Sequence, residues 1–134
     1  MFMQAWGNYG TAWAVVHQWL GVQPDLGSGR LVVVPQVPQG QPSVSGEHIR
    51  LGDGYADVAA SVSGSRYTTR IDVQRAVGAD RVAIGHTLPR GSRVGTVWLD
   101  GKVVRHPTTR TTNRGLEVTV PTRSGSHTLV VTTR

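Results

Sequence analysis

Hydrophobic positions along this chain follow two different periods, and the period changes once. Between Met3 and Leu20 the spacing is helical, because Trp6, Trp13 and Leu20 recur every seven residues. A further tryptophan lies on another side of the same helix, and Gly21 follows its last residue. A helix that is apolar on several sides is typical of a buried helix. The pattern therefore predicts one buried N-terminal α-helix.

After residue 24 the pattern becomes that of β-strands. Each run is short, rich in Val, Thr or Ile, and bounded by Gly, Asp, Asn, Ser or Pro. Asp100 and Gly101 separate two such runs and predict a type I′ hairpin, which needs positive φ at both central residues. Residues 37–46 are interpreted as a connection with little strand signal. The predicted strands are 30–35, 48–52, 55–62, 66–73, 81–88, 93–99, 102–106, 116–120 and 127–133.

These elements together predict a mainly β protein: an antiparallel β-sandwich preceded by one N-terminal α-helix. The length of 134 residues and the 38% hydrophobic content fit one folded domain. No run approaches the roughly 18 apolar residues of a membrane-spanning helix, and no basic segment precedes Met3 as in a signal peptide. We therefore expect no membrane partner. The absence of Cys excludes disulfides and thiolate metal sites but leaves the compartment open.

The net charge of +6 is concentrated in the second half of the chain. From Arg66 onward there are 12 Lys and Arg against 4 Asp and Glu, whereas the first 65 residues hold 2 against 4. The arginines are spaced singly among Thr and Val, which is typical of a solvated sheet face. We therefore expect no nucleic-acid partner.

Candidate catalytic and metal-binding groups show none of the patterns that their chemistry needs. The acidic residues fall mostly in turns or on exposed strand faces, and no serine lies in a G-x-S-x-G context. The histidines lack metal-ligand spacing and are interpreted as structural or surface residues. We expect no catalytic residue, no metal and no cofactor in this chain. The residues concerned are Asp25, Glu47, Asp53, Asp57, Asp72, Asp80, Asp100 and Glu117, and His17, His48, His86, His106 and His127.

Three aromatic residues of the predicted sandwich could stack on a sugar ring, namely Trp98, Tyr55 and Tyr67. Packing in the core or at an edge is the favoured interpretation for them. Whether Trp98 or its neighbours Val97 and Leu99 face the core stays open at this level.

Several motifs, taken in order, resemble a known family. They are "QAW" at the start of the predicted helix, "LGVQPD" at its end, the run "LVVVPQVP", and "IRLGDGYADV". This order resembles the junction between the catalytic and C-terminal β-domains of bacterial glycoside hydrolases of the glycogen-debranching, amylo-α-1,6-glucosidase-like type. The later "IGHTLPRGSRVGTVWLDGKVV" is similar to the closing β-domain of these and of rhamnosidase-like hydrolases.

The resemblance implies two regions and a role for the chain within a larger enzyme. Residues 1–24 would be the last helix of an (α/α)6 catalytic barrel and residues 25–134 a C-terminal accessory β-sandwich. Gln4, Trp6, Asn8 and Tyr9 could border a substrate pocket, because barrel helices point their ends at it, and burial in the barrel is an equally good account of Trp6. The catalytic acids of that family lie in the barrel, so the resemblance implies a hydrolase parent and no hydrolase activity for this chain itself. Secretion of that parent stays open.

Two functional hypotheses stay open at this level. The first is a non-catalytic region that supports the catalytic barrel of a carbohydrate-active enzyme, with that barrel as its partner. The second is an independent carbohydrate-binding or adhesive sandwich. The N-terminal helix discriminates between them: packing entirely on its own sandwich would favour the second hypothesis, whereas exposed tryptophan faces would favour the first and would allow self-association. We also expect that deleting residues 1–20 leaves the sandwich folded.

Overall fold

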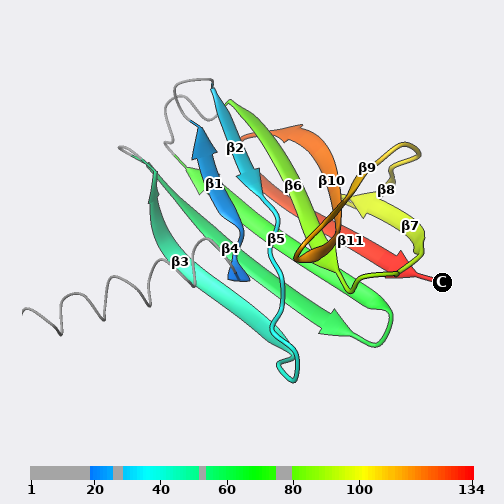
Figure 1. Cartoon of the computed structure of the whole chain (residues 1–134). Coiled ribbons are helices and arrows are strands. Elements are labelled where there is room, and N and C mark those ends of the chain that lie inside the picture. The colour runs from blue at the N-terminus through cyan, green and yellow to red at the C-terminus, as the bar shows by residue number, and fades with distance from the viewer. Residues whose placement is uncertain (1–18, 26–28, 52–53, 75–79) are drawn as a thin grey trace, which may run out of the picture.

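The computed structural model describes residues 19–25, 29–51, 54–74 and 80–134, which form two β-sheets packed face to face (Figure 1). The five-stranded sheet has the order β1-β2-β6-β10-β9, and the six-stranded sheet the order β3-β4-β5-β11-β7-β8. Neighbouring strands are antiparallel except β2 and β6, which run parallel. The strands are β1 (Val22–Asp25), β2 (Arg30–Val33), β3 (Ser43–Leu51), β4 (Gly54–Ser63), β5 (Arg66–Gln74), β6 (Arg81–Leu88), β7 (Val94–Leu99), β8 (Lys102–Val103), β9 (Thr108–Thr112), β10 (Gly115–Arg123) and β11 (Ser126–Thr133).

The inner faces of the two sheets enclose one hydrophobic core. Along β4, the buried Ala56, Val58 and Ala60 alternate with residues that point to the outside, as the pleat of a strand requires. The mainly β character and the two-sheet architecture predicted from the sequence are confirmed. The largest fully buried side chains include Leu20, Leu31, Ile84, Leu88, Leu129 and His86.

The strongest local signals in the sequence are also confirmed. The run predicted at 81–88 is β6 with the same bounds, and the run at 66–73 is β5 with one more residue. The predicted hairpin joins β7 and β8, and its central residues Asp100 and Gly101 have φ of 52° and 81°. These two positive angles are those of a type I′ turn.

The sequence pattern missed two strands and misassigned part of a third. β1 and β9 were not predicted, and the first half of β3 was wrongly assigned to a connection. β9 is an exposed edge strand of sequence TTRTT without apolar alternation, and β3 carries a bulge between Gly46 and Ile49 that breaks its period of two. The strand predicted at 102–106 shrinks to Lys102–Val103.

The predicted N-terminal helix lies outside the described residues except for its last two, and the described residues contain no α-helix. Trp19 and Leu20 lead into the sheet instead. The backbone N–H of Gln36 donates to the Trp19 carbonyl at 2.7 Å, and that of Val34 donates to the Gly21 carbonyl at 3.1 Å. Leu20 has no exposed surface and belongs to the sandwich core.

The boundary predicted between residues 24 and 25 falls inside β1. Among the described residues, no helix has the length and apolar character needed to cross a membrane.

Candidate functional site

The residues predicted to border a substrate pocket, Gln4, Trp6, Asn8 and Tyr9, lie outside the described residues. The predicted self-associating helix lies there as well, apart from its last two residues: Trp19, whose surface is 43% exposed, and the buried Leu20. The chemistry that can be placed is therefore that of the sandwich.

The three candidate aromatic residues have three different environments. Val97 takes the core position in β7, so Trp98 faces outward and is half-buried, with Val130 and Val103 as its neighbours in register. Tyr55 lies flat on His48, with ring centroids 4.4 Å apart, and its hydroxyl donates to Gln74 Oε1 at 3.1 Å. Tyr67 packs against the core. The outward aromatics are thus engaged with neighbouring side chains of the sheet.

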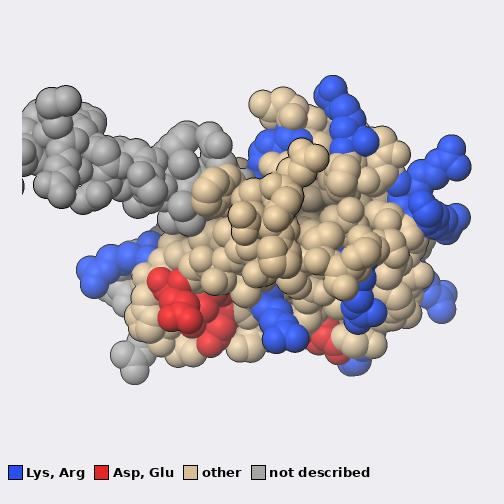
Figure 2. Space-filling model, turned by 90° about the horizontal axis from the view of Figure 1, so that it is seen from below, with Lys and Arg blue, Asp and Glu red and all other residues tan. Residues whose placement is uncertain are grey.

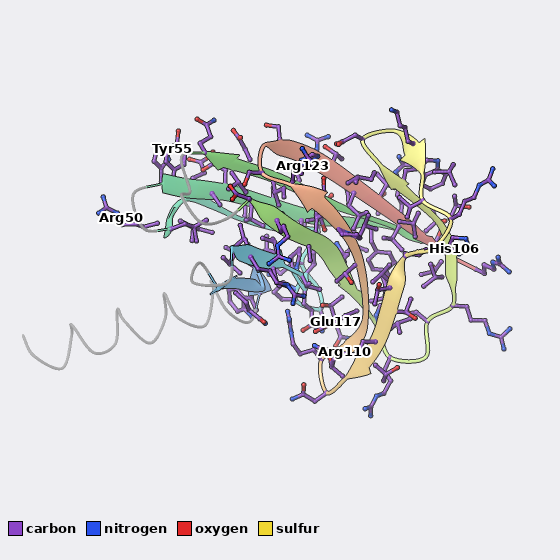
Figure 3. All side chains as sticks on the ribbon, turned by 90° about the horizontal axis from the view of Figure 1, so that it is seen from above. Arg50, Tyr55, His106, Arg110, Glu117 and Arg123 are labelled. Atoms are coloured by element: carbon purple, nitrogen blue, oxygen red, sulfur yellow. The ribbon has the colours of Figure 1, made fainter. Side chains whose placement is uncertain are left out.

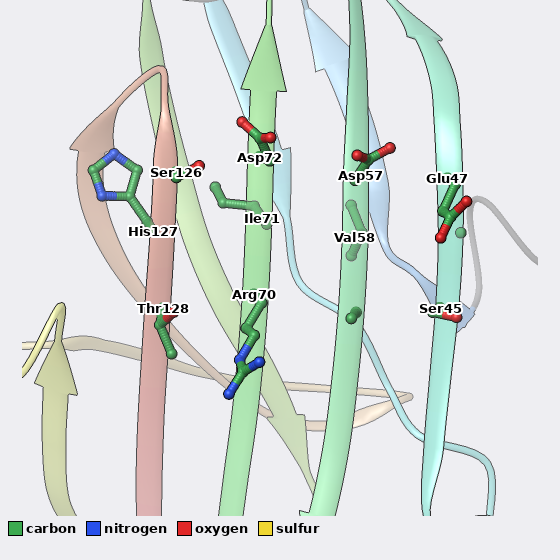
Figure 4. A pocket seen from close by; sticks show the side chains of 12 residues that line it. Ser45, Glu47, Asp57, Val58, Arg70, Ile71, Asp72, Ser126, His127 and Thr128 are labelled. Atoms are coloured by element: carbon green, nitrogen blue, oxygen red, sulfur yellow. The ribbon is translucent and has the colours of Figure 1, made fainter.

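A shallow trough of about 370 Å³ crosses the outer face of the six-stranded sheet (Figure 4). Asp57 and Asp72 are direct partners in the register of β4 and β5, and Glu47 projects from the bulge of β3. Carboxylates directly opposite each other on neighbouring strands repel. Glu47, Asp57 and Asp72 make the trough negatively charged. The cationic Arg70 lies at one end of it.

Both paired carboxylates accept hydrogen bonds from the sheet itself. The His48 backbone N–H donates to Asp57 Oδ1 at 2.8 Å, and Gln74 Nε2 donates to Asp72 Oδ2 at 2.9 Å. The Asp57 side chain is 40% exposed, so its charge is largely compensated by solvent. No group of three or more metal-ligating side chains that could hold an ion occurs in the described residues.

The outer face of the five-stranded sheet carries a different charged group (Figure 3). Glu117, only 9% exposed, accepts from Arg110 Nη2 at 3.2 Å and lies 3.8 Å from Arg114 Nη1. Burial lowers the pKa of Arg114, and the charge of Glu117 opposes that shift. The Arg114 guanidinium also donates to the Val34 carbonyl at 3.3 Å, so this cluster fastens the segment after β2 to the β9–β10 turn.

A second polar cluster joins two hairpins. Asp100, at the β7–β8 turn, accepts from the Thr128 N–H at 2.8 Å and lies 2.7 Å from His127 Nδ1, while His127 Nε2 lies 2.8 Å from the Arg123 carbonyl. Partial burial acts to raise the pKa of Asp100, but the hydrogen bonds from His127 and Thr128 and the charges of His127 and Lys102 outweigh it and lower the pKa. This cluster is structural, because it holds a turn in place.

Basic side chains elsewhere are spread singly over the surface, as Figure 2 shows for one face, while the acidic ones on that face gather toward one edge.

Among the described residues, His86 is a histidine buried between the two sheets. His86 has no exposed surface, and its Nδ1 lies 2.9 Å from Thr69 Oγ1, which donates to the Gly85 carbonyl at 2.8 Å. Burial lowers the pKa of His86 to about 4, so the ring is neutral at neutral pH. Tyr67 approaches the ring edge-on, with centroids 5.3 Å apart.

His86 and Tyr67 line a pocket of about 470 Å³ beneath residues 36–41. These residues connect the two sheets, because the Thr87 N–H donates to the Pro35 carbonyl at 2.8 Å and the Val62 N–H to the Pro42 carbonyl at 2.9 Å. A turn closed by the Gln41 N–H and the Pro38 carbonyl forms the outer wall. Gly40 has φ of 84° there, as position i+2 of a type II turn requires.

The sequence interpretation of His86 as a structural or surface residue missed this pocket. The signal was present, because His86 occupies an inward position in the alternation of 81–88, together with Val82 and Ile84. The sequence could not show that Thr69 and Tyr67, on the other sheet, would meet it.

Comparison with known proteins supports the fold. No family model and no curated protein sequence matches the chain, whereas nine chains of known structure do. The α-L-rhamnosidase from Dictyoglumus thermophilum superposes with a TM-score of 0.56 and 12% identity, over 87% of this chain and 13% of that one. The α-1,4-glucan lyase of Gracilariopsis lemaneiformis superposes with a TM-score of 0.52 and 9% identity, over 78% of this chain and 14% of that one.

At such identities the likeness shows a shared fold. The chain thus has the fold of a β-domain found within two larger enzymes that are named for acting on carbohydrates, and it spans about one seventh of their length. Neither of them is named as a debranching enzyme.

Proposed function

We propose that the chain is the C-terminal accessory β-sandwich of a carbohydrate-active enzyme, a glycoside hydrolase of the glycogen-debranching type. One observation carries this proposal: its fold recurs as a small part of larger carbohydrate-acting enzymes. The order of the motifs "QAW", "LGVQPD", "LVVVPQVP" and "IRLG" supports the narrower debranching assignment. In this proposal, residues 1–24 complete the catalytic barrel and residues 25–134 cover it.

The placement of the carboxylates supports a non-catalytic role. A glycosidase needs two carboxylates on either side of the scissile bond, about 5 to 10 Å apart. The described carboxylates nearest to this arrangement, Asp57 and Asp72, stand side by side on an open sheet face and are engaged by His48 and Gln74. Both carboxylates project from the same sheet face, so they do not lie on opposite sides of a bound sugar.

A hydrolysis assay tests the non-catalytic role. The isolated chain should release no product from aryl α-glucosides or α-rhamnosides above the buffer rate. Asp57→Asn and Asp72→Asn serve as matched variants, because they keep shape and remove charge. Turnover by the chain that disappeared in either variant would refute the proposal.

The supporting role has a separate test. The genomic sequence upstream of residue 1 should encode a helical barrel in the same reading frame, and that barrel, produced alone, should bind the chain and gain thermal stability from it. A barrel equally stable and active with or without the chain would contradict a supporting role.

A further inference from the structure

The pocket under residues 36–41 is lined by His86, one of whose ring nitrogens is buried without a hydrogen-bond partner. Among the described residues, two buried side-chain atoms have no hydrogen-bond partner: His86 Nε2 and Thr87 Oγ1. Both residues line this pocket, but they follow each other in β6, so their side chains point to opposite faces and only that of His86 projects between the sheets. A buried polar atom without a partner costs about 1–3 kcal/mol, so such atoms are rare and call for an explanation.

The hydrogen bonds around His86 determine whether its second ring nitrogen, Nε2, donates or accepts. Thr69 has one hydroxyl proton and donates it to the Gly85 carbonyl, so its oxygen accepts from His86 Nδ1–H. A neutral imidazole with its proton on Nδ1 has a lone pair on Nε2. Nε2 is therefore an acceptor, and its missing partner is a donor such as a hydroxyl group.

The rest of the lining matches one class of ligand. The described residues that line the pocket include no Asp, Glu, Lys or Arg, and His86 is neutral at neutral pH. No side chain there compensates the charge of a charged ligand. Gln39 and Gln41 offer amide donors and acceptors, while Tyr67, Pro38 and Pro89 offer apolar surface. Sugars combine hydroxyl groups that donate and accept with C–H faces that pack on such surface. The volume of about 470 Å³ is that of a small-molecule site.

We propose that this pocket binds a neutral sugar unit and that one sugar hydroxyl donates its hydrogen bond to His86 Nε2. His86 has no exposed surface, so residues 37–41 shift outward when the sugar enters. Gln36 remains an anchor during this shift, since its Nε2 donates to the Arg114 carbonyl at 2.7 Å. The sandwich then recognises carbohydrate itself, which goes beyond the supporting role proposed above.

Nitrogen NMR of the full chain labelled with ¹⁵N-histidine tests this assignment directly. L-rhamnose, D-glucose and D-xylose are the probes, and D-glucuronate is the charged control. We expect one neutral sugar to move the His86 Nε2 resonance toward that of a hydrogen-bonded acceptor, with saturation on the order of 1 mM because the ligand has few atoms. D-glucuronate should bind at least tenfold more weakly.

Variants separate the pocket from the rest of the surface. His86→Phe keeps an aromatic ring and removes the acceptor, and should weaken binding at least tenfold. His106→Phe is the matched control, because His106 is exposed on a loop away from the pocket and should leave the affinity unchanged. If His86→Phe fails to fold, Gln39→Ala at the exposed rim replaces it and should weaken binding about threefold.

Three outcomes would overturn the proposal. The Nε2 resonance could already be that of a nitrogen bonded to water and stay unmoved at saturating sugar. The shifts could map instead to His48, which stacks on Tyr55 at the outer face. His106→Phe could weaken binding as much as His86→Phe. The hydrolysis and barrel-binding assays measure other quantities, so failure here leaves the accessory role standing, and the reverse also holds.

Discussion

Replacing Leu20 with alanine should destabilise the sandwich strongly. Leu20 has no exposed surface, and its Cδ1 lies only 2.5 Å from where a Cβ on Gly46 would be, so it fills the space against β3 closely. Core Leu→Ala changes cost about 2–5 kcal/mol, depending on how far the cavity collapses. We expect about 3 kcal/mol here, which for a chain of 134 residues corresponds to a melting temperature lower by about 11 °C.

Urea unfolding followed by circular dichroism measures this loss. The midpoint should fall while the slope stays constant, because the surface exposed on unfolding hardly changes. Val103→Ala is the control: Val103 is 60% exposed, and its truncation should cost less than about 0.5 kcal/mol.

Equal stabilities of Leu20→Ala and Val103→Ala would refute the reasoning. Leu20 would then lie outside the cooperative unit, as a domain boundary after residue 24 predicts. Deleting residues 1–20 was expected to leave the sandwich folded. That deletion would remove the buried Leu20 and the Trp19 carbonyl that accepts from the Gln36 N–H, so we expect it to destabilise the sandwich. A truncation that begins at Trp19 keeps both contacts.

Three more predictions concern the turns and charged clusters. Asp100→Asn should lower stability most at pH values above the ordinary carboxyl pKa of 3.8. The lowered pKa of Asp100 contributes stability that is lost as the pH falls through its folded-state value. Urea unfolding at several pH values between 2 and 7 measures this, and a difference between wild type and variant that does not change with pH would contradict it. Gly21→Ala should lower the free energy of unfolding by more than about 2 kcal/mol, because the added Cβ would lie 1.9 Å from the Val34 oxygen. Gly40→Ala meets no atom within 4 Å and should cost about 1 kcal/mol through its positive φ alone. Equal melting temperatures of the two variants would contradict this. Glu117→Gln should cost about 1–2 kcal/mol by denaturant unfolding, and an unchanged midpoint would remove its role in fastening the β9–β10 turn.

Local patterns account for the parts of the fold that were predicted. The run at 81–88 is a strand because its apolar residues alternate, and Asp100–Gly101 forms a type I′ turn because these two residues tolerate positive φ. These properties need no knowledge of distant residues. β9 was missed because it has no such local pattern. It is an exposed edge strand of sequence TTRTT, and pairing with its neighbour β10 stabilises it.

The sequence alone determined that this is a strand-rich protein with short hairpins and a mixed polar and apolar surface. It could not determine the parallel pairing of β2 with β6, the assignment of Leu20 to the sandwich core, or the meeting of His86 with Thr69 and Tyr67. Each of these depends on contacts between residues far apart in the chain, where the total free energy of packing and not the local pattern selects the partner. The candidate sugar pocket exists only because two sheets and the segment joining them close around one buried histidine.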